Sequence, residues 1–186
     1  RFSSIWLRGD AQVLSTILEG GSGFSATTFA LGRDCGGREM LHGSDEDLKR
    51  ALSFPAIQAI RKYTTSNPYT LTRCLECQQL QIEELFANLE EKVKARKLKC
   101  MLQENPSVCN ALKKLDVELG YTNEALGDPR EWYNRPDLLE EKTTSLEDIT
   151  GIFDASQSLT ELTIIYVERI DWATEAIQRL PCLTTL

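Results

Sequence analysis

Apolar residues recur three and four positions apart over much of the chain, and this spacing predicts helices. The clearest run covers residues 71–101, where the apolar positions form one stripe and the other faces carry Glu and Lys. Asn105-Pro106 ends this helix and starts a second one. The buried side of the second helix is expected to consist of Val108, Leu112, Leu115 and Leu119. The two helices would form an antiparallel hairpin.

Shorter helices are predicted before this hairpin. Residues 10–19 form an apolar-periodic segment in which Asp10 is the expected N-cap and Gly20 the stop signal. Seven of the 11 glycines fall between residues 20 and 43, so that region is expected to be loop. Ser44-x-x-Asp47 is a capping-box pattern, and Pro55 is a suitable first residue for a further helix.

The C-terminal segment fits two secondary structures. From Leu159 to Leu180 the apolar residues fit one face of a helix, but residues 162–167 are rich in β-branched and aromatic side chains, which favours a strand. We therefore expect a mainly α fold: a disulfide-stapled helical bundle with a Gly-rich N-terminal loop and a possible short strand at 162–167. We expect a single domain over 1–186. Its parts would be a short helix plus loop (1–43), a helical core (44–121) and a helical or repeat-like C-terminal part (122–186).

The same segment resembles a leucine-rich repeat. Residues 158–164 fit the L-x-x-L-x-L motif, and Leu183-x-x-Leu186 begins the pattern again 24 residues later. The resemblance covers about 28 residues, and we find no copy upstream, whereas a solenoid generally needs three or more repeats. The resemblance implies a strand at 162–167.

Composition and charge narrow the function classes. The chain has 186 residues, 41% of them hydrophobic, which argues against disorder. It carries 21 Lys and Arg against 28 Asp and Glu, a net charge of −7, which argues against a nucleic-acid partner. No apolar run approaches the roughly 20 residues that a membrane span needs.

The chain has six cysteines, an even number that allows three disulfides. They are Cys35, Cys74, Cys77, Cys100, Cys109 and Cys182. We expect disulfides, with one between Cys100 and Cys109 able to clip the turn at Asn105-Pro106. Two alternatives stay open: free buried thiols, and a zinc site built from the Cys74-x2-Cys77 and Cys100-x8-Cys109 pairs.

Catalytic motifs are absent from the sequence. His42 is the only histidine, so any acyl-transfer dyad would have to use it. The chain contains no Gly-x-Ser-x-Gly elbow, no His-Glu-x-x-His and no Walker-type phosphate loop. We therefore expect no enzymatic activity, no catalytic residues, no metal and no cofactor.

Two surface motifs are candidate binding sites. Arg8-Gly9-Asp10 is the tripeptide that integrin-type receptors read at an exposed loop tip; the alternative is that Asp10 caps a helix. Lys92, Arg96 and Lys99 share one helix face and could bind a sulfated glycan. The alternative for this row is that its cations complement the negative end of the helix dipole.

Together these features predict a secreted, non-enzymatic interaction protein, similar in style to effectors of saliva or venom, that binds an extracellular or host protein or glycan. One alternative is an intracellular adaptor fragment with a C-terminal leucine-rich-repeat-like segment and reduced cysteines. A hydrolase using His42 and a helical small-molecule carrier are the others.

Overall fold

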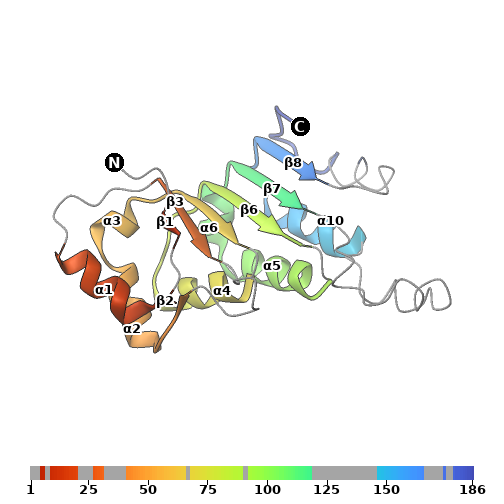
Figure 1. The fold of residues 1–186 in the computed structure, drawn as a ribbon. Helices are drawn as coiled ribbons and strands as arrows, with labels where there is room; N and C mark the ends of the chain where they lie inside the picture. Colours follow the sequence, from red (N-terminus) through yellow and green to blue (C-terminus); the bar gives the residue numbers. More distant parts are fainter. Residues whose placement is uncertain are drawn as a thin grey trace. The chain divides into compact units, whose positions relative to one another are not determined.

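The computed structural model describes residues 5–6, 9–20, 27–31, 41–65, 68–89, 92–118, 146–165, 174 and 178–186. These residues belong to two compact units, Arg1–Phe86 and Ala87–Leu186. Figure 1 shows the elements of both units, which are described separately here.

The first unit combines parallel strands with short helices. Its main sheet has the order β1 (Ile5–Trp6), β3 (Thr28–Leu31) and β5 (Lys62–Thr65), and the start of β6 (Glu84–Asn88) lies beside β5. A two-stranded parallel sheet pairs β2 (Gly9–Asp10) with β4 (Leu41–His42). The helices are α1 (Ala11–Gly20), α2 (Asp45–Leu52), α3 (Pro55–Gln58) and α4 (Pro68–Cys77).

The second unit continues the same alternation of helix and parallel strand. The end of β6 is followed by β7 (Lys114–Glu118) and β8 (Glu161–Ile165) in that order. The helices are α5 (Lys92–Glu104), α6 (Pro106–Ala111) and α10 (Leu146–Ala155). In the parallel pair of β7 and β8, Lys114 lies opposite Glu161 and Glu118 lies opposite Ile165. A single bridge then joins Glu161 to Thr185.

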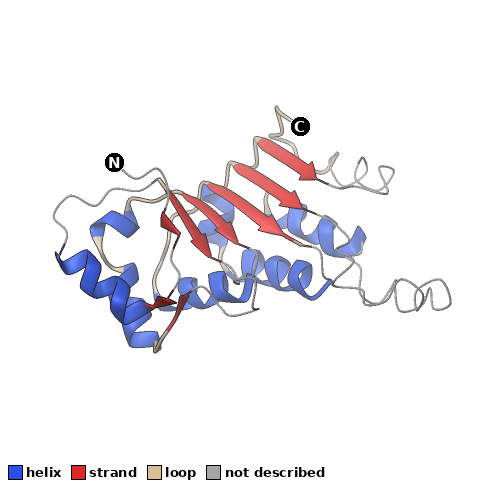
Figure 2. Ribbon diagram, viewed as in Figure 1, coloured by secondary structure: helices blue, strands red, loops and turns tan. Residues whose placement is uncertain are grey.

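Each crossover in these sheets leads to the neighbouring parallel strand. Such crossovers are almost always right-handed. When each new strand is added on the same side of the previous one, the crossover helices therefore all lie on the same face of the sheet. In the second unit, Figure 2 shows α5 and α10 on one side of β7 and β8. The residues that point to that side are buried, among them Leu115 and Val117 on β7 and Leu162 on β8.

The expected disulfide-stapled helical bundle is wrong: the fold is α/β with parallel strands. The predicted helix over 71–101 is interrupted, because α4 ends at Cys77 and α5 begins at Lys92. Between them, β6 buries Leu85 and Ala87 in alternation, which is the period of a strand. Leu85 and Phe86 also fit a helical stripe, so the apolar spacing alone could not separate the two structures.

The predicted second helix of the hairpin is also too long. The observed helix, α6, stops at Ala111, and β7 begins at Lys114. In β7, Leu115 and Val117 are buried, whereas the polar residues beside them are partly exposed. This alternation of buried and polar positions indicates a strand, but the same residues also fit the expected helix, so the strand was not predicted.

Part of the motif near the C-terminus also recurs upstream. A pair of apolar residues three positions apart, the second of them inside a strand, is buried at Ile60/Tyr63, Ile82/Leu85, Leu112/Leu115 and Leu159/Leu162. Successive copies are separated by 22, 30 and 47 residues, and Leu183 follows 24 residues after Leu159. These pairs reproduce the first two apolar positions of the L-x-x-L-x-L motif, and their unequal spacing explains why they escape a search for a fixed period.

Several local predictions are confirmed. A strand lies at Glu161–Ile165, close to the possible strand at 162–167. Ser44 is the N-cap of α2, where its hydroxyl accepts a hydrogen bond from the backbone N–H of Asp47 at 3.2 Å and donates to that residue's carboxylate. Pro55 and Pro106 each stand at the first turn of a helix. The expected helix over 10–19 is α1, and Asp10 directly precedes it.

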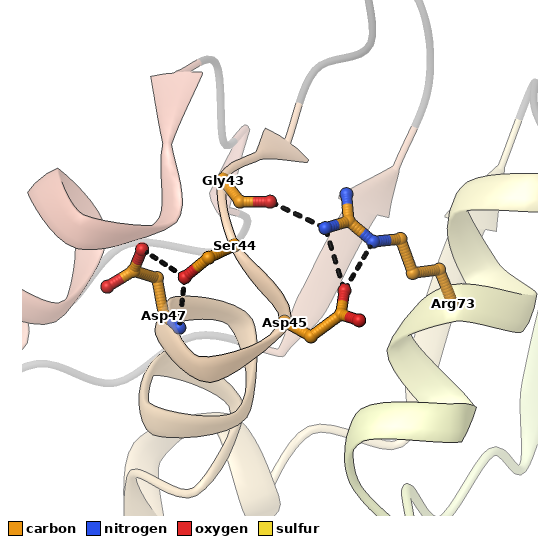
Figure 3. Close-up of polar contacts among 5 residues, drawn as sticks. All are labelled: Gly43, Ser44, Asp45, Asp47 and Arg73. Atoms are coloured by element: carbon orange, nitrogen blue, oxygen red, sulfur yellow. Dashed lines mark hydrogen bonds and ion pairs between the residues drawn. The ribbon is translucent and has the colours of Figure 1, made fainter.

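An arginine ties two helices of the first unit together beside this cap. The guanidinium of Arg73, on α4, donates to one oxygen of Asp45 from Nε (2.9 Å) and from Nη2 (2.8 Å), and also to the carbonyl of Gly43 (Figure 3). Gly43 has φ 138°, a conformation that favours glycine. The start of α2 is thus held both by its own cap and by α4.

The predicted disulfides are not found among the described cysteines. Five of the six cysteines are described, and no disulfide joins any two of them: Cys74, Cys77, Cys100, Cys109 and Cys182. Cys35 lies outside the described residues. Cys109 instead donates a hydrogen bond to the carbonyl of Leu102 at 2.8 Å, across the turn that a bridge was expected to clip. The helices and strands are held by apolar packing, so covalent links are not needed at these positions.

We predict that the protein unfolded without reductant contains six reactive thiols by Ellman titration. In the native protein, Cys100 and Cys182 should react first because both are exposed, and Cys74 and Cys109 should react only on opening because both are buried. Burial raises the pKa of Cys77, and the negative charge of Asp45 raises it further, whereas the positive charge of Arg73 lowers it. Because the net shift is upward, alkylation of Cys77 should require a more alkaline pH than alkylation of an ordinary thiol. A titration that finds no free thiol before reduction would contradict the structure.

Candidate functional site

The side of each sheet that faces away from the helices is the candidate site, and we call it the open face. Successive residues of a strand point to opposite sides, so the residues between the buried positions lie on this face. In the second unit it consists of Asn88 on β6, Lys114, Asp116 and Glu118 on β7, and Glu161, Thr163 and Ile165 on β8. These side chains are exposed or partly exposed, whereas their neighbours Leu115, Val117 and Leu162 are buried.

Strand pairing sets these side chains in register. Asp116 lies opposite Thr163, and Glu118 lies opposite Ile165. Because the backbone hydrogen bonds of the sheet fix the strands, the face presents its polar groups in rows that are already ordered before any partner binds. A surface ordered in this way loses little conformational entropy on binding.

The charges of this face are only partly matched. The ammonium of Lys114 lies 3.6 Å from a carboxylate oxygen of Glu161, and the amide of Asn88 donates to Glu118 at 3.1 Å. Oδ1 of Asp116 is buried and has no hydrogen-bond partner among the described residues. A carboxylate oxygen that has lost its water without gaining a donor is destabilising.

The open face of the first unit carries matched charges. Lys62 on β5 pairs with Glu84 on β6 at 3.2 Å, and Arg61 pairs with Glu83 at 3.8 Å just before these strands. Phe86, also on β6, is partly exposed on this face. This part of the face therefore offers an aromatic ring among neutralised charges.

The structure places two residues of the predicted Arg8-Gly9-Asp10 site in a strand. Gly9 and Asp10 form β2, where they pair with Leu41 and His42 of β4. Arg8 lies outside the described residues. A receptor-type tripeptide requires an exposed loop tip, and backbone pairing in a strand does not provide one. Receptor recognition by this tripeptide stays a prediction that the placement does not favour.

Two cations of the predicted glycan row have an internal partner. Lys99 and Arg96 lie 3.3 and 3.5 Å from Oδ1 of Asp148, in the first turn of α10, and the Asp148 side chain is only 2% exposed. Lys92 lies at the start of the same helix. Gly151, one turn further along α10, allows this approach, because a Cβ there would overlap Cδ of Lys99. The row thus helps to join α5 to α10, and glycan binding stays a prediction.

Metal and membrane sites are not found in the described part of the chain. No group of three or more His, Cys, Asp or Glu side chains is arranged to hold a metal ion there, so the zinc alternative for Cys74, Cys77, Cys100 and Cys109 has no geometric support. Among the helices of that same part, none is both long and apolar enough to cross a bilayer.

The residues of the open face were missed by the sequence analysis because they belong to strands that were expected to be helices. One signal was available: Lys114, Asp116 and Glu118 alternate with two apolar residues. Such alternation predicts a strand with one solvent-exposed side, and a binding site would be sought on that side.

Comparisons of the chain with known protein families, with curated proteins and with solved structures find no match.

The packing of Lys99 against Gly151 predicts that the effect of Gly151→Ala on the free energy of unfolding changes sign when Lys99 is also replaced. Gly151→Ala alone should destabilise the protein by about 1–3 kcal/mol, because the new methyl displaces the Lys99 side chain from Asp148. In a Lys99→Ala background the same substitution should stabilise by about 0.5–1 kcal/mol, because alanine favours a helix over glycine. Urea unfolding measures both free energies.

Lys92→Ala serves as the control, since it removes the same charge from the first turn of α5. In that background Gly151→Ala should stay destabilising. If Gly151→Ala costs the same free energy in all three backgrounds, the glycine does not act through Lys99.

Proposed function

We propose that the chain is a repeat-type scaffold that binds another protein through the open face of its parallel sheet and has no catalytic role. The observation that carries this proposal is the division of β5, β6, β7 and β8 into a side buried against helices and a side of ordered, accessible, mostly polar groups. Stacked strand and helix units that expose one sheet face are a common architecture for extended binding surfaces.

The recurring buried pair supports a leucine-rich-repeat-like scaffold of this kind. Each described copy places an apolar residue in a strand and a second one three positions earlier, and both are buried, as at Leu112/Leu115 and Leu159/Leu162. These positions build the scaffold, which leaves the intervening positions, such as Asp116 and Thr163, available for recognition.

The cysteines favour the adaptor alternative over the secreted protein expected from the sequence. The inference of secretion depended on disulfides, and no disulfide joins any two of the five described cysteines. Proteins that work in reducing compartments keep their thiols free. We therefore propose a reducing compartment as the place of action.

Site-specific photo-cross-linking tests the proposal. A benzoylphenylalanine placed at Thr163, on the open face, should yield a protein adduct in an extract of the source cells. The same group at Val93, an exposed position on α5 (55% exposed), is the matched control. We expect the Thr163 adduct to disappear when unlabelled protein is added in excess, because the binding surface is then occupied.

The comparison between the two positions decides the outcome. Competable adducts at Val93 and none at Thr163 would assign recognition to the helical side and contradict the proposal. A Thr163→Lys competitor should fail to suppress the adduct, since a long charged side chain on the face obstructs docking, whereas a Val93→Lys competitor should suppress it fully.

A further inference from the structure

We propose that the open face of the second unit docks an extended basic segment of a partner protein, with Asp116 and Glu118 receiving its Arg or Lys side chains. This inference rests on the proposed function and names the chemistry of the partner. It depends on three features of the face: its charge balance, one desolvated carboxylate oxygen, and the spacing of the two acids.

The charge balance of this face is acidic. It carries one lysine and three carboxylates, and the lysine, Lys114, is already paired with Glu161. Asp116 and Glu118 have no ion pair among the described residues. On the first unit, by contrast, Lys62 and Glu84 neutralise each other. Complementarity therefore directs a cationic partner to the second unit.

The Asp116 carboxylate gives this attraction a specific position. Its Oδ1 atom is buried without a hydrogen-bond donor, while the side chain as a whole is partly exposed. The terminal torsion of an aspartate is broad, so a partial rotation about Cβ–Cγ can bring both carboxylate oxygens toward the surface, whereas a half-turn would only exchange them. A guanidinium from the partner would then supply the missing donor, and the bond would be charge-assisted.

The spacing of the two acids matches an extended chain. Asp116 and Glu118 are two residues apart on one strand, which separates them by about 7 Å on the same side of the sheet. Alternate side chains of an extended peptide have the same separation. A segment with basic residues at alternate positions, such as Arg-x-Arg, can therefore reach both carboxylates while its backbone stays straight.

The neighbouring strand leaves room for this segment. Thr163, which lies opposite Asp116, is short and exposed, so it does not cover the carboxylate. Ile165, which lies opposite Glu118, offers apolar surface on which the aliphatic stem of an arginine can pack. A nucleic acid is not an alternative for this face, because its phosphates would meet carboxylates.

Fluorescence anisotropy with two labelled peptides of equal composition tests the inference. One has the core Thr-Arg-Thr-Arg-Thr, with alternate arginines, and the other has the core Thr-Arg-Arg-Thr-Thr. We expect the wild-type chain at near-physiological salt to bind the alternating peptide more tightly. Asp116→Asn combined with Glu118→Gln should weaken that binding by about tenfold, the loss expected for two partly exposed charge pairs.

A second double variant controls for net charge. Glu104→Gln combined with Glu147→Gln removes the same charge from two exposed positions on α5 and α10, and it should leave affinity unchanged within about twofold. Lys114→Gln should tighten binding, because it releases Glu161 and makes the face more acidic. Urea midpoints confirm that each variant folds, and the gain expected for Lys114→Gln cannot result from unfolding.

Three results would overturn the inference. Equal losses in both double variants would mean attraction by net charge only. Weaker binding by Lys114→Gln, or no binding of either peptide by the wild type, would each contradict docking at this face. If competable cross-links at Thr163 persist when the peptides fail to bind, the proposed function stands and only the basic partner is wrong.

Discussion

The burial of alternate strand residues against helices is the interaction on which the rest of the structure depends. Leu115 and Val117 illustrate it in β7: both are fully buried beneath helices of the second unit, and burying a side chain of this size contributes about 1.5–3 kcal/mol. Once these two residues face the helices, the geometry of the strand sends Lys114, Asp116 and Glu118 to the other side. The core therefore determines which residues can meet a partner.

Charged side chains play opposite roles on the two sides of the second unit. On the helical side, Asp148 is buried but lies close to Lys99 and Arg96, and such an arrangement joins α5 to α10 as long as the cations stay in place. On the open face, Asp116 has a buried oxygen without a donor. The first carboxylate is satisfied by the fold, and the second has bonding capacity that a partner can use.

Local signals in the sequence were sufficient for helix starts and insufficient for the strands. The Ser44 cap and the prolines at 55 and 106 act through their own backbone, so they are readable without knowledge of the fold. The residues of β6 were misread because Leu85 and Phe86 also complete a helical stripe, and only packing against neighbouring elements decides between the two periods.

The recurring buried pairs and the absence of disulfides among the described cysteines were both hard to predict, because each depends on which residues, far apart in sequence, come close in space. The buried pairs recur at unequal intervals because the connections between strands differ in length, so a fixed period is not visible. The cysteine count suggested bridges, but pairing requires proximity in space, and Cys109 instead meets the Leu102 carbonyl. The open face could not be predicted while its strands were taken for helices.

The most direct test of this account is a scan in which each residue from 114 to 118 is replaced in turn by aspartate, or by asparagine at Asp116, and the free energy of unfolding is measured in urea. The account predicts a period of two, with large losses at Leu115 and Val117 and small changes at the three positions between and beside them. A period near four, with Leu115 sensitive and Val117 tolerant, would indicate a helix and would contradict the open face altogether.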